Sequence, residues 1–230
     1  MDKKAWIVFS VVVIALFAGL IVSSNQNKVD VSSVDNTKIS QPSADNGNIG
    51  EHVFGKTDSP VVLIEYGDFQ CPGCGTAHPI LKSLSEKYEG QIAFVFRNFP
   101  LTSIHPNALA AAASAEAAGL QDNYWPMHNM IYENQANWER LSSSERTDVF
   151  AGYADKLGLD VAQFKTDVNL SKISEKISFD QARAKQANVT GTPTIFLGGE
   201  LINQDVWGSE AELEKAIQAQ LKANNIALPK

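Results

Sequence analysis

The sequence is poor in cysteine, and its two cysteines lie in one short motif. Only Cys71 and Cys74 occur among the 230 residues. A scaffold held together by disulfides needs bridges between distant segments, so that class of protein is excluded. Two thiolates are also too few for a four-cysteine zinc site or for an iron–sulfur cluster held by cysteines. The pair therefore has to be explained as a local feature of the chain.

Basic side chains are outnumbered by acidic ones. The chain has 19 Lys and Arg residues against 26 Asp and Glu residues, which gives a formal net charge of -7 at pH 7. Binding to the phosphate backbone of a nucleic acid favours the opposite balance, so we expect no nucleic-acid partner. Hydrophobic residues make up 44% of the chain and charged residues 20%, which is typical of a globular protein.

One long apolar run lies near the N-terminus. Residues 5–22 are apolar except for Ser10 and Gly19. A helix of this length spans roughly 27 Å, close to the thickness of the hydrocarbon core of a bilayer. A buried helix of a soluble domain usually has a polar face, which this run lacks. A cleaved signal peptide is the closer alternative, because Val22-Ser23-Ser24 offers small residues at a cleavage site. We interpret residues 1–22 as an uncleaved transmembrane signal-anchor.

Charge and composition then predict where the rest of the chain lies. Lys3 and Lys4 precede the apolar run, and positive flanks stay in the cytoplasm. We therefore expect a single-pass cell-membrane protein whose functional domain is extracytoplasmic, in the periplasm or at the cell surface. Residues 23–50 are rich in Ser, Asn, Asp and Gln and show no hydrophobic periodicity, which predicts a disordered linker. The globular domain is expected over residues 51–230.

Hydrophobic patterns in this domain predict a βαβ unit followed by helices. The apolar run Val61–Tyr66 is typical of a buried strand, Cys74–Tyr88 has helical spacing, and Ile92–Phe96 is a second strand. The two strands are expected to be parallel, with a right-handed crossover. Four helices should follow, at about 107–118, 122–133, 142–157 and 171–187. Two strands, 194–197 and 200–202, then flank a two-residue turn, and a helix capped by Ser209 and Glu212 closes the domain.

The chemistry is expected at Cys71-Pro72-Gly73-Cys74. Cys71 lies between a strand and a helix, where unpaired N–H groups and the helix dipole favour an anion. Such positions lower the pKa of a thiol, and a stabilised thiolate makes the corresponding disulfide a stronger oxidant. We expect Cys71 to be the exposed, attacking sulfur and Cys74, inside the helix, to be the resolving one.

Three other interpretations of the pair are open. As a structural staple, it would close a loop of about four residues and contribute only around 2 kcal/mol. As half of a zinc site, it would need ligands such as His78 and His105. Covalently attached haem requires a histidine directly after the second cysteine, where this chain has Gly75. A C-x-x-C motif beside a βαβ pattern favours dithiol redox chemistry instead.

The residues around the motif resemble the DsbA-like thiol-disulfide oxidoreductases of the thioredoxin superfamily. The resemblance extends from Glu51 to about Ala223, the whole expected domain. A Gly-Thr-Pro-Thr sequence before a strand near the C-terminus makes it far more specific than C-x-x-C alone. The matching stretches are Glu51–Gly55, Val61–Cys74, Phe99–Leu101, His105–Ala108 and Gly191–Thr194.

The resemblance implies a fold and roles for several residues. The fold is α/β, a thioredoxin fold (βαβ…ββα) with a helical domain inserted at about 101–187. Pro193 would be a cis-proline facing the cysteine pair, and the Thr192 backbone would pair with an extended substrate segment. Glu65 would move the proton of Cys74, with a pKa raised by burial. A strand-end carboxylate that reaches water is the alternative for Glu65.

Some positions depart from the family pattern or have structural explanations. The best-known DsbA-like oxidases carry Pro-His between the cysteines, whereas this chain has Pro72-Gly73, which leaves its oxidising strength open. Pro79 matches a proline that bends the first helix. We expect His78 on the solvated face of that helix and His105 in a capping or packing role. Aromatic residues of the helical block, His128, Trp125 and Trp138, are expected in its core.

The predicted function is therefore extracytoplasmic thiol-disulfide exchange. A Cys71–Cys74 disulfide would react with reduced exported proteins and introduce disulfides into them, and a separate membrane partner would reoxidise the dithiol. No cofactor and no metal are expected. A disulfide reductase or isomerase of the same fold is one alternative. A non-catalytic thioredoxin-fold module that binds peptides or a metal is another.

Overall fold

The computed structural model describes residues 6, 9–10, 12–14 and 29–229. The chain forms two units, Met1–Asp30 and Val31–Lys230. Most of the run in which we expect the membrane helix, residues 5–22, lies outside the described residues, as do residues 23–28 of the expected linker. Within the described part of the chain, no helix is both long enough and apolar enough to cross a membrane.

The second unit follows the predicted order of a βαβ unit, a helical block and a ββα unit. The predicted elements are found within a few residues of their expected ends, whereas the short strand β1 and the short helices α6 and α8 were not predicted. The elements are η1 (Ala44–Asn46), β1 (Val53–Gly55), β2 (Val62–Gly67), α2 (Pro72–Lys87), β3 (Ala93–Asn98), α3 (Ala108–Gly119), α4 (Tyr124–Glu133), η2 (Gln135–Asn137), α5 (Ser143–Lys156), α6 (Val161–Asp167), α7 (Ser171–Gln186), β4 (Thr194–Leu197), β5 (Glu200–Ile202), α8 (Gln204–Trp207) and α9 (Glu210–Ala223).

A mixed five-stranded sheet lies at the centre of this unit. Its strand order is β1-β3-β2-β4-β5. Only β2 and β3 are parallel, as the βαβ pattern predicted, and the other three pairs are antiparallel. All residues of β2 and of β3 are buried, which explains why both read as nearly continuous apolar runs. The sheet thus carries Glu65 in its middle strand, opposite Ile195 of β4.

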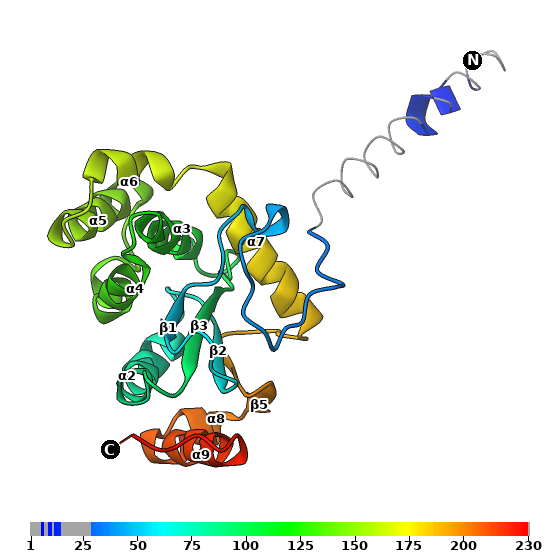
Figure 1. Cartoon of the computed structure of the whole chain (residues 1–230). Helices are drawn as coiled ribbons and strands as arrows, with labels where there is room; N and C mark the ends of the chain where they lie inside the picture. Colours follow the sequence, from blue (N-terminus) through cyan, green and yellow to red (C-terminus); the bar gives the residue numbers. More distant parts are fainter. Residues whose placement is uncertain (1–5, 7–8, 11, 15–28, 230) are drawn as a thin grey trace. The chain divides into compact units, whose positions relative to one another are not determined.

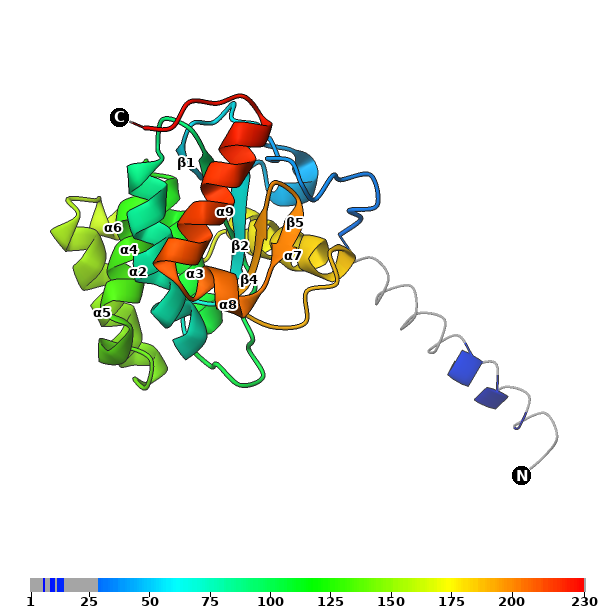
Figure 2. The same cartoon turned by 90° about the horizontal axis from the view of Figure 1, so that it is seen from below.

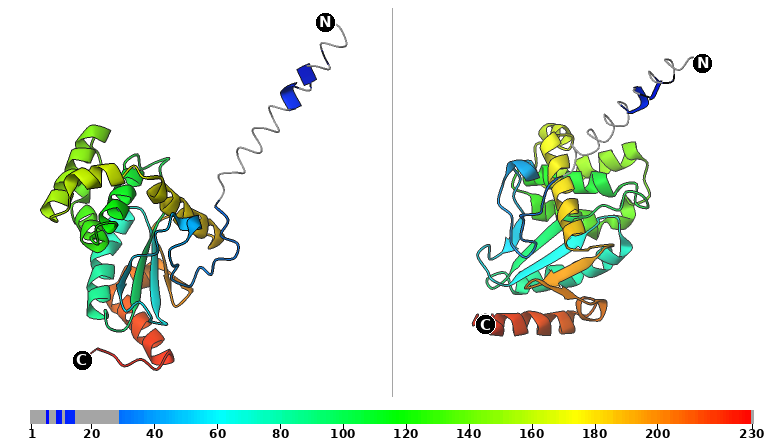
Figure 3. Two further views of the ribbon diagram at one scale, coloured as in Figure 1. Left: turned by 45° about the horizontal axis from the view of Figure 1, so that its top comes forward. Right: turned by 90° about the vertical axis from the view of Figure 1, so that its right-hand side faces the viewer.

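Helices cover both faces of the sheet. On one face α2 and α9 pack through residues such as Leu81 and Ile217, which are 1% and 0% exposed. On the opposite face Ala184 of α7 packs against alternating residues of β2 and β3. Figures 2 and 3 show α9 on one side of the strands and α7 on the other. The fold is therefore the three-layered α/β arrangement that the thioredoxin resemblance implied.

The helical block is inserted between β3 and β4. Helices α3 to α6 lie together beyond one end of the sheet, and α7 leads back along it (Figure 1). The core of this block contains Trp138, whose side chain is fully buried and whose indole N–H donates to the Ile131 carbonyl at 2.9 Å. The predicted core positions of Trp138 and His128 are confirmed, since His128 is 1% exposed.

The prediction of a disordered linker is wrong for residues 31–50, which we call the N-terminal arm. The arm belongs to the same compact unit as the sheet. The Arg97 guanidinium donates to the Asn36 and Lys38 carbonyls at 2.7 and 2.9 Å, and that of Arg183 donates to the Asp35 and Lys38 carbonyls at 2.9 Å. Buried arginines from distant elements thus order a segment that has little apolar surface of its own to bury.

Candidate active site

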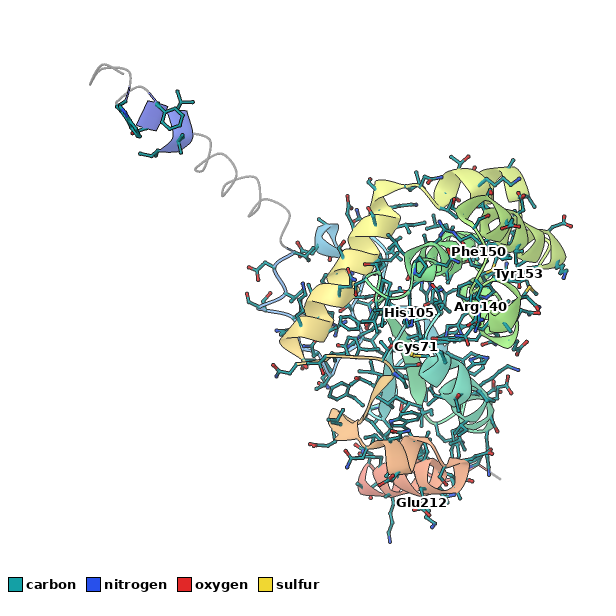
Figure 4. The ribbon with its side chains drawn as sticks, turned by 180° about the vertical axis from the view of Figure 1, so that it is seen from behind. Cys71, His105, Arg140, Phe150, Tyr153 and Glu212 are labelled. Carbon is teal, nitrogen blue, oxygen red and sulfur yellow. The ribbon has the colours of Figure 1, made fainter. Side chains whose placement is uncertain are left out.

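The first turn of α2 positions the cysteine pair. Cys71 is the N-cap residue, with φ -70° and ψ 124°, and Pro72 takes the first helical position. Proline fits there because its missing N–H would have no partner inside the helix. The Cys71 carbonyl accepts the Gly75 N–H at 3.1 Å and so begins the helix. Figure 4 shows Cys71 at this end of α2. The helix dipole and the free N–H groups of the first turn therefore face its sulfur.

The two thiols differ in exposure, although less than we predicted. Cys71 is 8% exposed and Cys74 is 0% exposed. Cys71 is the more exposed of the two thiols, as predicted, but the prediction of an openly exposed Cys71 is wrong. The segment before β4 covers the sulfur: Cys71 Sγ lies 3.4 Å from the Thr192 carbonyl oxygen, and a Cβ on Gly73 would stand 3.2 Å from Pro193 Cδ. The pair is thus enclosed between α2 and the Thr192–Pro193 segment.

The surroundings separate the acidities of the two thiols. A hydrogen bond from the Cys74 thiol, helped by the N–H groups of Cys74 and Gly73, lowers the pKa of Cys71 to about 5 against the opposing effect of burial. Burial raises the pKa of Cys74 well above its usual range, and its hydrogen bond to Cys71 raises it further. Cys71 is therefore the thiolate and Cys74 the protonated partner near neutral pH, which is the division of roles that the helix position predicted.

Glu65 lies below the pair on β2 and is cut off from water. Its residue is 1% exposed, and its Oε1 atom has no hydrogen-bond partner. Burial raises the pKa of Glu65 to about 8, the negative charge of Cys71 adds to this rise, and a hydrogen bond with Cys74 opposes it. The alternative of a carboxylate that reaches water is therefore wrong. Near neutral pH the structure places a protonated carboxyl group in contact with Cys74.

The Thr192–Pro193 peptide bond is cis, as the family resemblance implied. Thr192 comes two residues before the paired part of β4, in which Thr194 lies opposite Tyr66 of the central strand. The segment therefore lies beside the cysteine pair because β4 is anchored to β2. Cys71, Cys74, Glu65, Thr192 and Pro193 are five predicted site residues that the structure brings together.

A hydrogen-bonded turn before Cys71 was missed at the level of the sequence. Asp68 Oδ1 accepts the Gln70 N–H at 2.8 Å, and Asp68 Oδ2 accepts the Leu101 N–H at 2.8 Å. Oδ2 also bonds to Nδ1 of His105 at 2.7 Å, and Gln70 Oε1 accepts the Asn107 N–H at 2.6 Å. A signal was available, because an acidic residue directly after a buried strand needs partners. This turn fixes the backbone that carries Cys71.

The prediction for His78 is wrong, because this side chain is not on a solvated face. It is 5% exposed, and its ring stacks on that of Tyr132 with centroids 4.9 Å apart. Burial lowers the pKa of His78 to about 4 and that of His128 to about 3. The reason is that α4 packs against this face of α2, a contact that helical periodicity within α2 alone does not reveal.

The zinc interpretation of the cysteine pair loses its proposed ligands. His105 is bonded to Asp68, and His78 is stacked on Tyr132. Across the part of the chain that the structure describes, no three His, Cys, Asp or Glu side chains converge as a metal site would require. The arrangement at Cys71 and Cys74 is one of two thiols and a carboxyl group, which supports proton and disulfide chemistry.

Comparison with known sequences agrees with this geometry. The profile of a family described as Thioredoxin matches residues 47–219. A Bacillus anthracis protein named probable disulfide bond formation protein D is 31% identical over 221 residues, which cover 94% of each chain. The Na(+)/H(+) antiporter NhaA 1 of Salinispora arenicola is 38% identical over 149 residues, 65% of this chain and 22% of the antiporter. The chain thus spans only a small part of the antiporters that it matches.

Solved structures show the same fold. BdbD from Bacillus subtilis superposes with a TM-score of 0.65 at 22% identity, covering 80% of this chain and 98% of that one. The thiol-disulfide exchange protein alpha-DsbA2 from Wolbachia pipientis gives a TM-score of 0.63 at 21% identity, covering 74% and 87%. The fold of these structures agrees with the family profile and with the Bacillus anthracis relative. The chain belongs to the thioredoxin superfamily, among the DsbA-like thiol-disulfide oxidoreductases.

Proposed function

We propose that this protein is an extracytoplasmic thiol-disulfide oxidoreductase that introduces disulfides into reduced exported proteins. The observation that carries the proposal is the pairing of a Cys71 thiol whose pKa is about 5 with a buried, protonated Cys74. A thiolate stabilised in the reduced protein makes the dithiol form more stable relative to the disulfide. The disulfide form is therefore a good acceptor of electrons from a client.

The reaction consists of two exchanges of sulfur. In the oxidised enzyme a client thiolate attacks Sγ of Cys71, a client–Cys71 bond forms, and the Cys71–Cys74 bond breaks with its electron pair on Cys74. Glu65 gives its proton to the Cys74 sulfur, because the two groups are in contact and the pKa of Glu65 lies near 8. A second client thiolate then attacks the client sulfur of the mixed disulfide. The client leaves oxidised, and Cys71 leaves as a thiolate.

The Thr192–Pro193 segment is the proposed binding surface for the client backbone. It lies against Cys71, and a client strand that pairs with the Thr192 backbone would bring its own sulfur to that thiol. Recognition through the backbone suits an enzyme that acts on many unfolded chains, because it does not depend on the client's side chains.

The location and the partners are proposed from the sequence. The apolar residues 5–22 and the preceding lysines support an anchored protein with an extracytoplasmic domain. Only two cysteines are present, so the electrons have to leave through a separate protein. We propose a reoxidising partner in the membrane, and no cofactor.

Reoxidation of reduced, unfolded ribonuclease tests the activity. Wild-type chain should restore ribonuclease activity faster than Cys71→Ser, and equal rates would remove the enzymatic proposal in favour of a non-catalytic binding module. Equilibration with glutathione tests the direction. A potential near about -120 mV would mark an oxidase, whereas one near about -270 mV would mark a reductase.

A further inference from the structure

A loop of the helical block lies against the turn that carries Cys71. This loop, residues 101–107, is held through Asp68, which bonds to the Leu101 N–H and to the His105 ring, and through Gln70, which bonds to the Asn107 N–H. The Asp68 carbonyl in turn accepts the Cys71 N–H at 3.0 Å. Asp68 is therefore bonded on one side to His105 and on the other to the backbone of Cys71. Figure 4 labels His105 and Cys71 in the same part of the domain.

Asp68 fixes which nitrogen of the imidazole carries the proton. Its carboxylate is buried and already accepts two backbone N–H groups. The bond of 2.7 Å between Asp68 Oδ2 and His105 Nδ1 therefore requires Nδ1–H as the donor. The lone pair is then on Nε2, and no protein group in the described part of the chain is bonded to that atom. The His105 side chain is 16% exposed, so part of it reaches the surface.

We propose that His105 is the general base that removes the proton from the attacking client thiol. The inference rests on the proposed function. The client S–H gives its proton to Nε2 of His105, and the client sulfur forms its bond to Sγ of Cys71. The Cys71–Cys74 bond breaks, its electron pair goes to Cys74, and Cys74 takes the proton of Glu65. His105 then releases its proton to water, so atoms and charges balance.

The charged groups around the imidazole are few. Asp68 contacts it from the turn before α2. Arg146 of α5 donates to the Pro106 carbonyl at 3.3 Å and to Asn107 Oδ1, so its charge is one residue away from His105. Asp68 therefore holds the ring in place through its Nδ1 atom.

The size of the effect follows from the ionisation of an ordinary thiol. With a pKa of about 8.5, a client thiol is only about 3% ionised at pH 7 and about 0.3% ionised at pH 6. A base that removes the proton during the attack can therefore gain at most about 30-fold at pH 7 and about 300-fold at pH 6. A positioned base reaches only part of this maximum rate gain. We therefore expect loss of His105 to slow the attack about tenfold at pH 6.

The test uses oxidised full-length protein and a peptide with one cysteine. Attack on the disulfide is followed by acid quenching and mass spectrometry between about pH 5 and pH 8, for wild type and for His105→Gln. The rate of wild type should fall less steeply than the thiolate concentration of the peptide. The variant should follow the thiolate concentration, with a deficit of about tenfold at pH 6 that vanishes near pH 8.

His52→Gln is the matched control. His52 is also paired with a buried carboxylate, with Nε2 of the ring 2.9 Å from Glu116 Oε2, and its side chain is 19% exposed. It should keep the wild-type profile. The proposal is overturned if His105→Gln keeps the wild-type profile, or if it is slower by the same factor at every pH, as a displaced loop would cause. Failure of the proposed function looks different, because wild type itself would then not react with the peptide.

Discussion

The Cys74 thiol is the largest cause of the low pKa of Cys71, and replacing it gives a sharp test of the site. A hydrogen bond to a charged group contributes about 1.5–3 kcal/mol, and about 1.4 kcal/mol corresponds to one pH unit in a pKa. Cys74→Ala should therefore raise the pKa of Cys71 by about 1 to 2 from its value of about 5. Cys74→Ser keeps an O–H donor at the same place and should leave the pKa close to that of wild type.

The rate of alkylation of Cys71 by iodoacetamide, measured against pH, reports this pKa directly. Reduced wild-type protein can be alkylated only slowly at the buried Cys74, so the profile belongs to Cys71. We expect midpoints near 5 for wild type and for Cys74→Ser, and a higher midpoint for Cys74→Ala. Equal midpoints for the Ala and Ser variants would show that the thiol of residue 74 is not the donor. A wild-type midpoint near 8.5 would refute the whole electrostatic account of the site.

The same pKa makes the stability of the reduced protein depend on pH. The folded-state pKa of Cys71 lies below its ordinary value of 9.0. Its contribution is therefore fully present above pH 9 and is lost as the pH falls towards 5. At pH 7 the gap of two pH units corresponds to about 3 kcal/mol, which we reduce to roughly 2 kcal/mol because Sγ is partly screened by solvent. Urea unfolding of reduced wild type and Cys71→Ala should show this difference at pH 7 shrinking at pH 5.

Four further outcomes are expected. Glu65→Gln should slow disulfide exchange about a hundredfold, because Cys74 loses its proton carrier. Rapid-quench kinetics measures this rate, and an unchanged rate would contradict the role of Glu65. A Glu65 carboxyl with a folded pKa of about 8 favours the fold below pH 4.5 and loses this effect as the pH rises through 8, so denaturation of the reduced Gln variant should lack that loss. His78→Phe should make the fold less sensitive to acid, because a histidine whose folded pKa is about 4 destabilises the fold progressively as the pH falls from 6.5 to 4. Thermal melts at pH 4.5 and 7 measure this. The prediction is contradicted if the difference in melting temperature between the two pH values is the same in the variant and in wild type. Arg183→Met should cost about 3–5 kcal/mol and open residues 31–50 to protease, since it removes one partner of a buried ion pair; Arg140→Met, at an exposed arginine, is the control and should leave the cleavage pattern unchanged.

Sequence patterns were sufficient where a residue's environment is set by its near neighbours. The strand that carries Glu65, the helix that begins beside Cys71 and the turn at Gly198-Gly199 all follow from local periodicity and turn chemistry. The position of Cys71 before a helix was enough to predict which thiol ionises. The Thr192–Pro193 segment required the family resemblance, because nothing local connects it with a motif about 120 residues earlier.

The remaining features depend on contacts between distant segments. The N-terminal arm has the composition of a linker, and it is ordered by Arg97 and Arg183, which the sequence does not mark as its partners. The burial of His78 comes from α4, whose Tyr132 covers its face of α2. Strand β1 is only three residues long and pairs antiparallel with β3, so it has too little periodicity to be recognised. In each case a long-range contact overrides the local pattern.

The insertion of the helical block between β3 and β4 has a consequence for biosynthesis. The chain leaves the ribosome from its N-terminus, so the cysteine motif is made long before the segment around Thr192 that encloses it. Strand β4, which pairs with the central strand in the register Leu63 to Leu197, is among the last parts to emerge. A growing chain therefore carries its dithiol uncovered while about 120 further residues are made, and the active centre can be assembled only after β4 has emerged.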